Sequence, residues 1–153
     1  MTKYAFEGSA VLVKPPILTE SALVKDAVTI NPGNVVIDAG PGANAGKYDI
    51  GASGATYVRG VAIEKRIGSD ANEKRPLTVV RKGLVRVIAD GAIPIGSRLK
   101  AGATGKVKAM TTADEAAGVK GIGVHFSKDD GSQADAADGD TLIAEIDTAL
   151  GGV

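Results

Sequence analysis

The residues best suited to acid–base or nucleophilic chemistry are few in this chain. His125 is the only histidine and there is no cysteine, which excludes thiol catalysis, thiolate metal sites and disulfides. A Ser-His-Asp arrangement would have to use His125, but no Gly-x-Ser-x-Gly turn accompanies it. Val124 and Phe126 flank this histidine, which predicts a strand with His125 on the face opposite to both. We therefore expect a structural or surface histidine, and no catalytic residue.

Acidic residues gather between Ser127 and Asp140. Asp129-Asp130-Gly131 and Asp135-Ala136-Ala137-Asp138-Gly139-Asp140 could offer carboxylate oxygens to Ca²⁺, but the spaced ligands and terminal Glu of an EF-hand are missing. The pattern favours a solvated acidic loop, and we expect no metal site. The sequence alone leaves open whether residues 129–140 bind a cation.

Glycine-rich stretches do not fit the known phosphate-binding motifs. Before Gly105-Lys106, Lys100 stands where a phosphate loop has its first Gly, and Val107 stands where it has Ser or Thr. Gly40 to Gly46 has one residue too many for the dinucleotide fingerprint. Lys108 only weakly resembles the carrier lysine of biotinyl domains. We expect no cofactor and no small-molecule substrate, so a structural protein is favoured over a carrier or an enzyme.

Composition and charge narrow the partners further. Eighteen basic and eighteen acidic side chains cancel, so no broad field of one sign attracts nucleic acid or an anionic membrane. No apolar run approaches the roughly 20 residues of a membrane span, and the first residues do not form a secretory signal. We expect a protein that binds neither nucleic acid nor membrane and stays where it is made.

Two stretches of the sequence read almost alike, which suggests that one strand unit is used twice. They are Arg59-Gly60-Val61-Ala62-Ile63-Glu64-Lys65 and Lys120-Gly121-Ile122-Gly123-Val124-His125-Phe126-Ser127-Lys128. A basic residue and a glycine before an alternating apolar run are typical of the start of a strand. Short Val- and Ile-rich runs between turns elsewhere complete the pattern. The sequence predicts an all-β fold, a small β-barrel or β-tulip-like domain built from two similar halves.

Two local features refine this fold. Thr111 to Gly118 is the only good helical turn, with Thr as the N-cap and Gly as the stop, so at most one short helix is expected. Lys82-Gly83 marks a bend or bulge between the strands predicted at 77–80 and 84–88.

The first thirty residues differ from the rest because Lys14-Pro15-Pro16 interrupts any strand or helix. We expect an extended N-terminal arm over 1–30, a β-barrel domain over 31–148 with halves at about 31–80 and 81–148, and a C-terminal tail over 149–153. The arm either wraps its own barrel or lies on a neighbouring subunit or another protein. The apolar arm residues available for such contacts are Tyr4, Phe6, Val11, Leu12, Val13, Pro15, Pro16, Ile17 and Leu18.

The order of short motifs from Val35 to Asp147 resembles that of the small phage capsid cement or head decoration proteins. The motifs are Val35-Val36-Ile37, Gly60-Val61-Ala62, Leu77 to Val80 with Gly83, Ile95-Gly96-Ser97-Arg98-Leu99, Gly105-Lys106-Val107, Gly121-Ile122-Gly123-Val124 and Gly139-Asp140-Thr141-Leu142-Ile143. The loops at 68–76 and 127–140 are longer and more charged than the compact turns of that family.

The resemblance implies a non-enzymatic structural protein of the virion, made in the host cytoplasm. It would bind the major capsid protein on the outer surface of an icosahedral head, commonly as a homotrimer. The N-terminal arm lies outside the resemblance, and its apolar residues are the ones expected to contact the capsid or another subunit. The alternative from the same fold is a structural module of a phage tail or baseplate.

Overall fold

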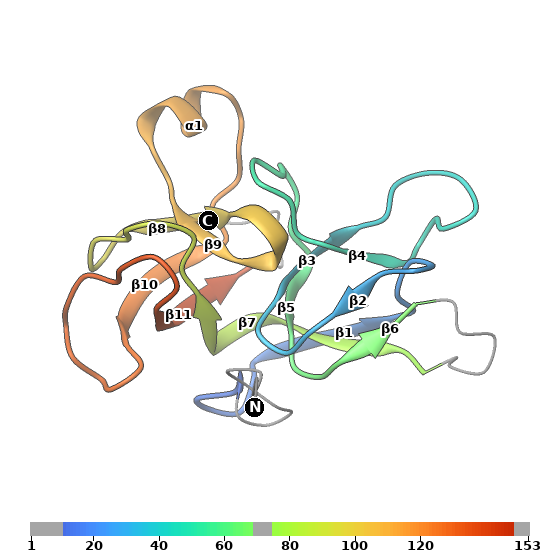
Figure 1. Ribbon diagram of the computed structural model, residues 1–153, viewed down its shortest axis with the longest axis horizontal. Helices are drawn as coiled ribbons and strands as arrows, with labels where there is room; N and C mark the ends of the chain where they lie inside the picture. The colour runs from blue at the N-terminus through green and yellow to red at the C-terminus, as the bar shows by residue number, and fades with distance from the viewer. Residues whose placement is uncertain (1–10, 69–74, 149–153) are drawn as a thin grey trace.

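A computed structural model of the chain describes residues 11–68 and 75–148, and nearly all its regular elements are strands (Figure 1). The strands are β1 (Leu18–Ala22), β2 (Thr29–Ile30), β3 (Val35–Asp38), β4 (Tyr48–Ile50), β5 (Gly60–Ala62), β6 (Arg66–Ile67), β7 (Leu77–Ile88), β8 (Arg98–Ala101), β9 (Val107–Ala109), β10 (Gly123–Lys128) and β11 (Thr141–Asp147). One short α-helix, α1 (Thr112–Ala116), and a 3-10 turn at Ala103–Gly105 accompany them. The predicted all-β class with at most one short α-helix is confirmed.

Nine strands form one curled antiparallel sheet, and β2 and β6 form a second, two-stranded sheet. The order of the large sheet is β4-β3-β5-β7-β11-β10-β8-β9, and β1 also pairs with β7. The 12-residue strand β7 pairs with β1 and β5 along its first half and with β11 along its second half. Figure 1 shows β7 running between a group of strands β1 to β6 on one side and β8 to β11 on the other.

Two clusters of aliphatic side chains form the core. The smaller cluster gathers Val24, Ile30, Leu77 and neighbours among β1 to β6. The larger cluster is built on the second half of β7 and on β8 to β11, and it also includes Val35 and Val61 from β3 and β5. The larger cluster thus takes residues from both of the ranges that the sequence predicts as halves, about 31–80 and 81–148.

The predicted bulge near Lys82-Gly83 lies inside one continuous strand. The pairing of β1 with β7 shifts between Leu18, opposite Lys82, and Thr19, opposite Val80. One extra residue, Arg81, is thus accommodated in β7 at this point, which is how a bulge re-aims a strand. The pairing of β11 with β7 passes the same residues without a shift.

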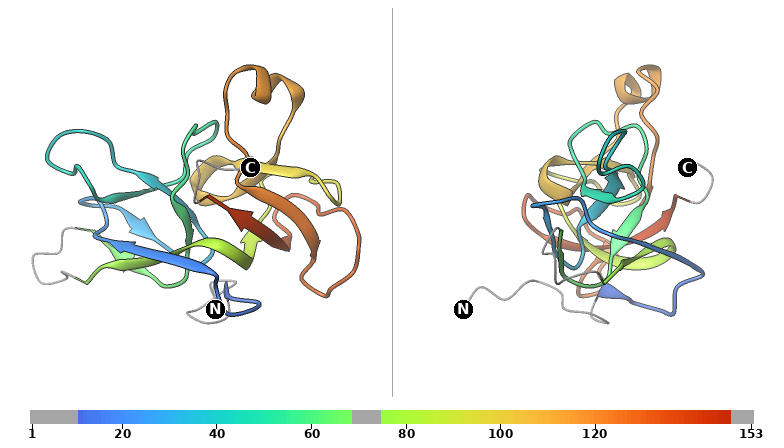
Figure 2. Two further views of the ribbon diagram at one scale, coloured as in Figure 1. Left: turned by 180° about the vertical axis from the view of Figure 1, so that it is seen from behind. Right: turned by 90° about the vertical axis from the view of Figure 1, so that its right-hand side faces the viewer.

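The helix α1 has the N-cap expected from the sequence. The Thr111 side chain accepts a hydrogen bond from the Asp114 backbone N–H, and the Asp114 carboxylate accepts one from the Thr111 backbone N–H. This reciprocal capping box stabilises even a one-turn helix. Figures 1 and 2 show α1 at the end of a loop that projects from the sheet.

From Val11 onward, the segment predicted as an extended arm lies along the chain's own sheet. Leu12 bridges to Val85, and the backbone N–H of Val13 donates to the Leu84 carbonyl. No strand pairing is made at the two prolines, and regular pairing begins with β1, which runs beside β7 (Figure 2). Tyr4 and Phe6, and the predicted tail over 149–153, lie outside the described residues.

The two glycine-led stretches both contain strands, β5 and β10, and in each a glycine allows a close approach of the neighbouring strand. A Cβ at Gly60 would lie 2.3 Å from the Val80 carbonyl oxygen, and one at Gly123 would lie 2.2 Å from the Glu145 carbonyl oxygen. In the two similar stretches of the sequence, Gly121 stands at the position of Gly60. In the structure, however, it is Gly123 that lies against the backbone of the neighbouring strand as Gly60 does. Only glycine fits such an approach.

We predict that Gly123→Ala lowers the free energy of unfolding by about 1–3 kcal/mol, because β10 and β11 must move apart. Gly46→Ala is the control, because Gly46 has a positive φ but no atom within 4 Å of the added Cβ, so it costs only about 1 kcal/mol of backbone strain. Urea unfolding of both variants measures the difference. Equal losses would contradict the steric explanation.

Candidate interaction surface

His125 is a structural residue of the core. Its side chain is buried on the inner face of β10, while Val124 and Phe126 are exposed on the outer face, as the alternation predicted. Its Nδ1 lies 3.3 Å from the Pro94 carbonyl oxygen. The sequence left open whether His125 is a structural or a surface residue, and the structure shows that it is structural.

The carboxylates of the acidic loop are held by partners within the chain. Asp129 forms an ion pair with Arg86. Asp135 and Asp138 accept hydrogen bonds from the backbone N–H groups of Ile95 and Gly91. Among residues 11–68 and 75–148, no group of three or more acidic, histidine or cysteine side chains is arranged to hold a metal ion. Asp129 therefore ties the loop to β7, and Asp135 and Asp138 tie it to the connection between β7 and β8.

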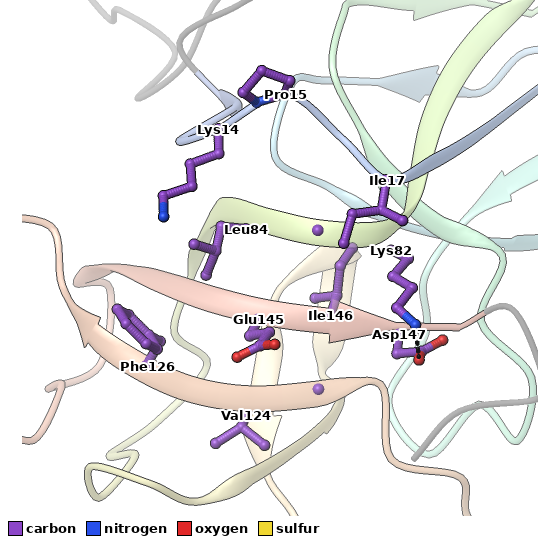
Figure 3. Close-up of a pocket in the computed structure, with 12 residues that line it drawn as sticks. Lys14, Pro15, Ile17, Lys82, Leu84, Val124, Phe126, Glu145, Ile146 and Asp147 are labelled. Atoms are coloured by element: carbon purple, nitrogen blue, oxygen red, sulfur yellow. Dashed lines mark ion pairs between the residues drawn. The ribbon is translucent and has the colours of Figure 1, made fainter.

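A groove of about 650 Å³ opens on the outer face of β7, β11 and β10 (Figure 3). One wall is the segment just before β1, and the floor is the sheet. The lining residues are Lys14, Pro15, Ile17, Lys82, Gly83, Leu84, Gly123, Val124, Phe126, Glu145, Ile146 and Asp147.

Alternation along the strands places these side chains outward. In β7, Val85 and Val87 point into the core, so Leu84 between them faces the groove. In β10 the same alternation exposes Val124 and Phe126. Ile17, 72% exposed, and Phe126, 48% exposed, give the groove two large apolar side chains in contact with solvent.

The groove also carries charges of both signs. Lys82 forms an ion pair with Asp147 at 3.4 Å across β7 and β11 (Figure 3). Lys14 and Glu145 take part in none of the ion pairs found in the described part of the chain. The surface thus combines exposed apolar side chains with one cation and one carboxylate available to a partner.

Arm residues predicted to make contacts divide into two groups in the structure. Val11 is fully buried in this chain's own core, and Leu12, Val13 and Pro16 are partly covered. Pro15, Ile17 and Leu18 are exposed, and the first two line the groove. Whether they contact a capsid or a subunit remains a prediction.

A charge network fixes β1, and with it the wall of the groove. Both oxygens of Glu20 are used: Oε1 accepts from the Tyr48 hydroxyl and the Arg59 Nε, and Oε2 accepts from Arg59 and Arg81. Arg81 also donates to the Thr148 carbonyl. The network joins β1, β4 and β7 with Arg59, the residue just before β5, and Thr148, the residue just after β11. Sequence reasoning missed it because its members lie far apart along the chain.

We predict that Glu20→Gln lowers the free energy of unfolding by about 2 kcal/mol, because the partly buried Arg81 and Arg59 lose the carboxylate that they share, although Arg59 keeps a longer ion pair with Asp38. Glu115→Gln removes the exposed pair with Arg98 and serves as the control, with an expected change within about 0.5 kcal/mol. Chemical denaturation measures both. Similar changes for the two variants would show that the Glu20 network does not anchor β1.

The same network perturbs the Tyr48 hydroxyl. Burial, followed by its hydrogen bond to Glu20 and the negative charge of Glu20, raises the pKa of Tyr48 well above its usual value near 10, against the smaller opposing effect of Arg59 and Arg81. The folded state therefore binds the phenolic proton more tightly than the unfolded state does.

We predict that Tyr48 contributes stability below about pH 10 that is lost as the pH rises toward its raised pKa, since the unfolded chain releases the proton first. Urea unfolding between pH 8 and 12 measures this. The decline in wild-type stability should be steeper than in Tyr48→Phe, while Tyr57→Phe, at an exposed tyrosine, should follow the wild type. Parallel curves for wild type and Tyr48→Phe would contradict the assignment.

No helix among the described residues is long and apolar enough to cross a membrane.

The sequence matches no protein family model, and no curated protein is recognisably similar to it. A solved structure, that of the N base of head fiber gp8.5 in bacteriophage phi29, is similar in fold. The TM-score is 0.58 at 15% sequence identity, and the alignment covers 86% of this chain and 96% of that chain. At this identity the likeness is one of fold. This curled all-β sheet is therefore a fold that also occurs in a protein of a phage head.

Proposed function

We propose that this chain is a non-enzymatic structural protein of the phage virion, bound to the outer surface of an icosahedral head. The observation that carries the proposal is the fold similarity to the N base of a phage head fiber protein over 96% of that chain. It adds to the order of short motifs from Val35 to Asp147 that resembles capsid cement and decoration proteins. The proposed partner is the major capsid protein, whose lattice this chain would cement or decorate.

The surface of the domain supports a binding role. Exposed Ile17, Val124 and Phe126 lie around one groove, and contiguous apolar surface of this kind marks interaction sites. The carboxylates of the acidic loop are engaged with backbone and arginine partners, and His125 is in the core. Among the residues that the structure describes, the exposed features are thus those of a contact surface.

A homo-oligomer, with a trimer favoured, would suit this role. Several modest contacts made at once raise avidity by orders of magnitude without any single strong contact. The N-terminal segment is the proposed contact with the capsid or with another subunit. Its exposed residues in the structure are Pro15, Ile17 and Leu18.

We predict that the purified chain sediments with intact phage heads from the cells in which it is produced, and that cryo-electron microscopy of these particles shows its density outside the capsid lattice. Density on a tail or baseplate would overturn the head assignment in favour of the alternative structural role. If the chain stays in the supernatant when it is mixed with heads, tails or whole particles, both the head role and the tail or baseplate role would be overturned.

A truncated chain tests the N-terminal contact in the same head-binding assay. The structure shows how many residues can be removed without disturbing the fold. Deleting residues 1–30 would remove β1 and the buried Val11, whereas deleting residues 1–10 leaves every described element in place. We expect the shorter deletion to weaken head binding at least tenfold with unchanged urea unfolding. Tyr57→Ala, which removes an exposed aromatic side chain outside the groove, is the control and should bind as the wild type does.

A further inference from the structure

The groove is an open site with a defined chemistry. Leu84, Val124 and Phe126 supply apolar surface from β7 and β10, and Ile17 adds to it from the facing wall. Lys14 on that wall and Glu145 on β11 have no ion-pair partner within the described ranges, while the neighbouring Lys82 and Asp147 neutralise each other. An occupant should therefore carry large apolar side chains between a cationic and an anionic group.

The first residues of this chain have that composition. Lys3-Tyr4-Ala5-Phe6-Glu7 places two aromatic side chains at alternate positions, between a lysine and a glutamate. In an extended segment, side chains at i and i+2 point to the same side, so Tyr4 and Phe6 would face one surface together. Lys3 and Glu7 would start on the other side of the segment, roughly 13 Å apart at about 3.3 Å per residue, and at its two ends their flexible side chains can bend back toward the same surface.

The point at which the described chain begins argues for a groove on another molecule. Val11 is buried in the core cluster that contains Val85 and Val87, on the inner face of β7. The groove lies on the outer face, where Leu84 points. Only Gly8, Ser9 and Ala10 separate Glu7 from Val11, so these two residues lie four Cα steps and at most about 14 Å apart. Leu12 and Val13 are held against β7, so residues 3–7 could enter the chain's own groove only if the chain reversed direction within this short linker.

We propose that the groove binds residues 3–7 of a second copy of this chain. Tyr4 and Phe6 of the second copy pack on Val124, Phe126 and Leu84, Lys3 pairs with Glu145, and Glu7 pairs with Lys14. The second copy thus completes a site that one copy leaves open.

This contact is heterologous, because a terminal segment of one copy meets a different surface of the next. Such contacts close into rings when the rotation between copies allows it. The inference deepens the trimer included in the proposed function, since it names the surfaces that hold the copies together. It also accounts for the effect expected from deleting residues 1–10, because a monomer loses the avidity of a ring.

Cysteine trapping tests the proposal, and the natural chain is a clean background because it has no cysteine. The chain with both Phe6→Cys and Val124→Cys is purified without heads and oxidised mildly. We expect disulfide-linked oligomers on a non-reducing gel, and a heterodimer when the two single-cysteine chains are mixed. Phe6→Cys with Tyr57→Cys is the control, because Tyr57 is exposed outside the groove, and it should remain monomeric.

A monomer with an internal disulfide, identified by mass spectrometry, would show that the segment covers its own groove and would overturn the proposal. Absence of any cross-link, with urea unfolding equal to wild type, would also overturn it. Head binding by a chain that forms no such oligomer would leave the proposed function standing, so the two failures are distinguishable.

Charge reversal provides a second readout by analytical ultracentrifugation. Glu145→Lys should weaken self-association about tenfold, because Lys3 then meets a like charge, and adding Lys3→Glu should restore it. Glu115→Lys, far from the groove on α1, is the matched control and should have no effect. Failure of the double variant to recover would overturn the pairing of Lys3 with Glu145.

Discussion

The structure depends on the pairing of β7 along both of its edges. Backbone N–H and C=O groups that leave water must find partners, and a 12-residue strand through the middle of a domain has many of them. β1, β5 and β11 supply these partners, together with the segment before β1, which donates to the Leu84 and Lys82 carbonyls. Because β7 contributes to both aliphatic clusters, its pairing fixes how they sit together.

This pairing also determines what the surface can do. Alternation along β7 and β10 turns Leu84, Val124 and Phe126 outward, and the segment held against β7 builds a wall opposite them. The Glu20 network ties that wall to β4, to β7 and to the residues just before β5 and just after β11. The groove is therefore as rigid as the sheet beneath it, which lowers the entropy lost when a partner segment binds.

Patterns local in the sequence predicted much of the fold. The capping box of α1 needs only Thr111 and Asp114, three residues apart, and the face of His125 follows from its two neighbours. The disturbance at Lys82-Gly83 was also predicted, although it is a bulge within one strand and Arg81 is the extra residue. The groove was not predicted, because its lining comes from four separate stretches of the chain and exposed apolar residues have no signature of their own in a sequence.

The sequence by itself determined the all-β class, the short capped helix, the placement of His125 opposite to Val124 and Phe126 and the absence of cysteine chemistry, since these follow from residue type and spacing over a few positions. Tertiary structure alone decided that Glu20 joins Tyr48, Arg59 and Arg81, that Gly123 matches Gly60, and that residues 14–17 face β10 across a groove. The physical reason is that these contacts join residues from different strands. Strand order and register, which place such residues side by side, are set by burial and backbone pairing over the whole sheet.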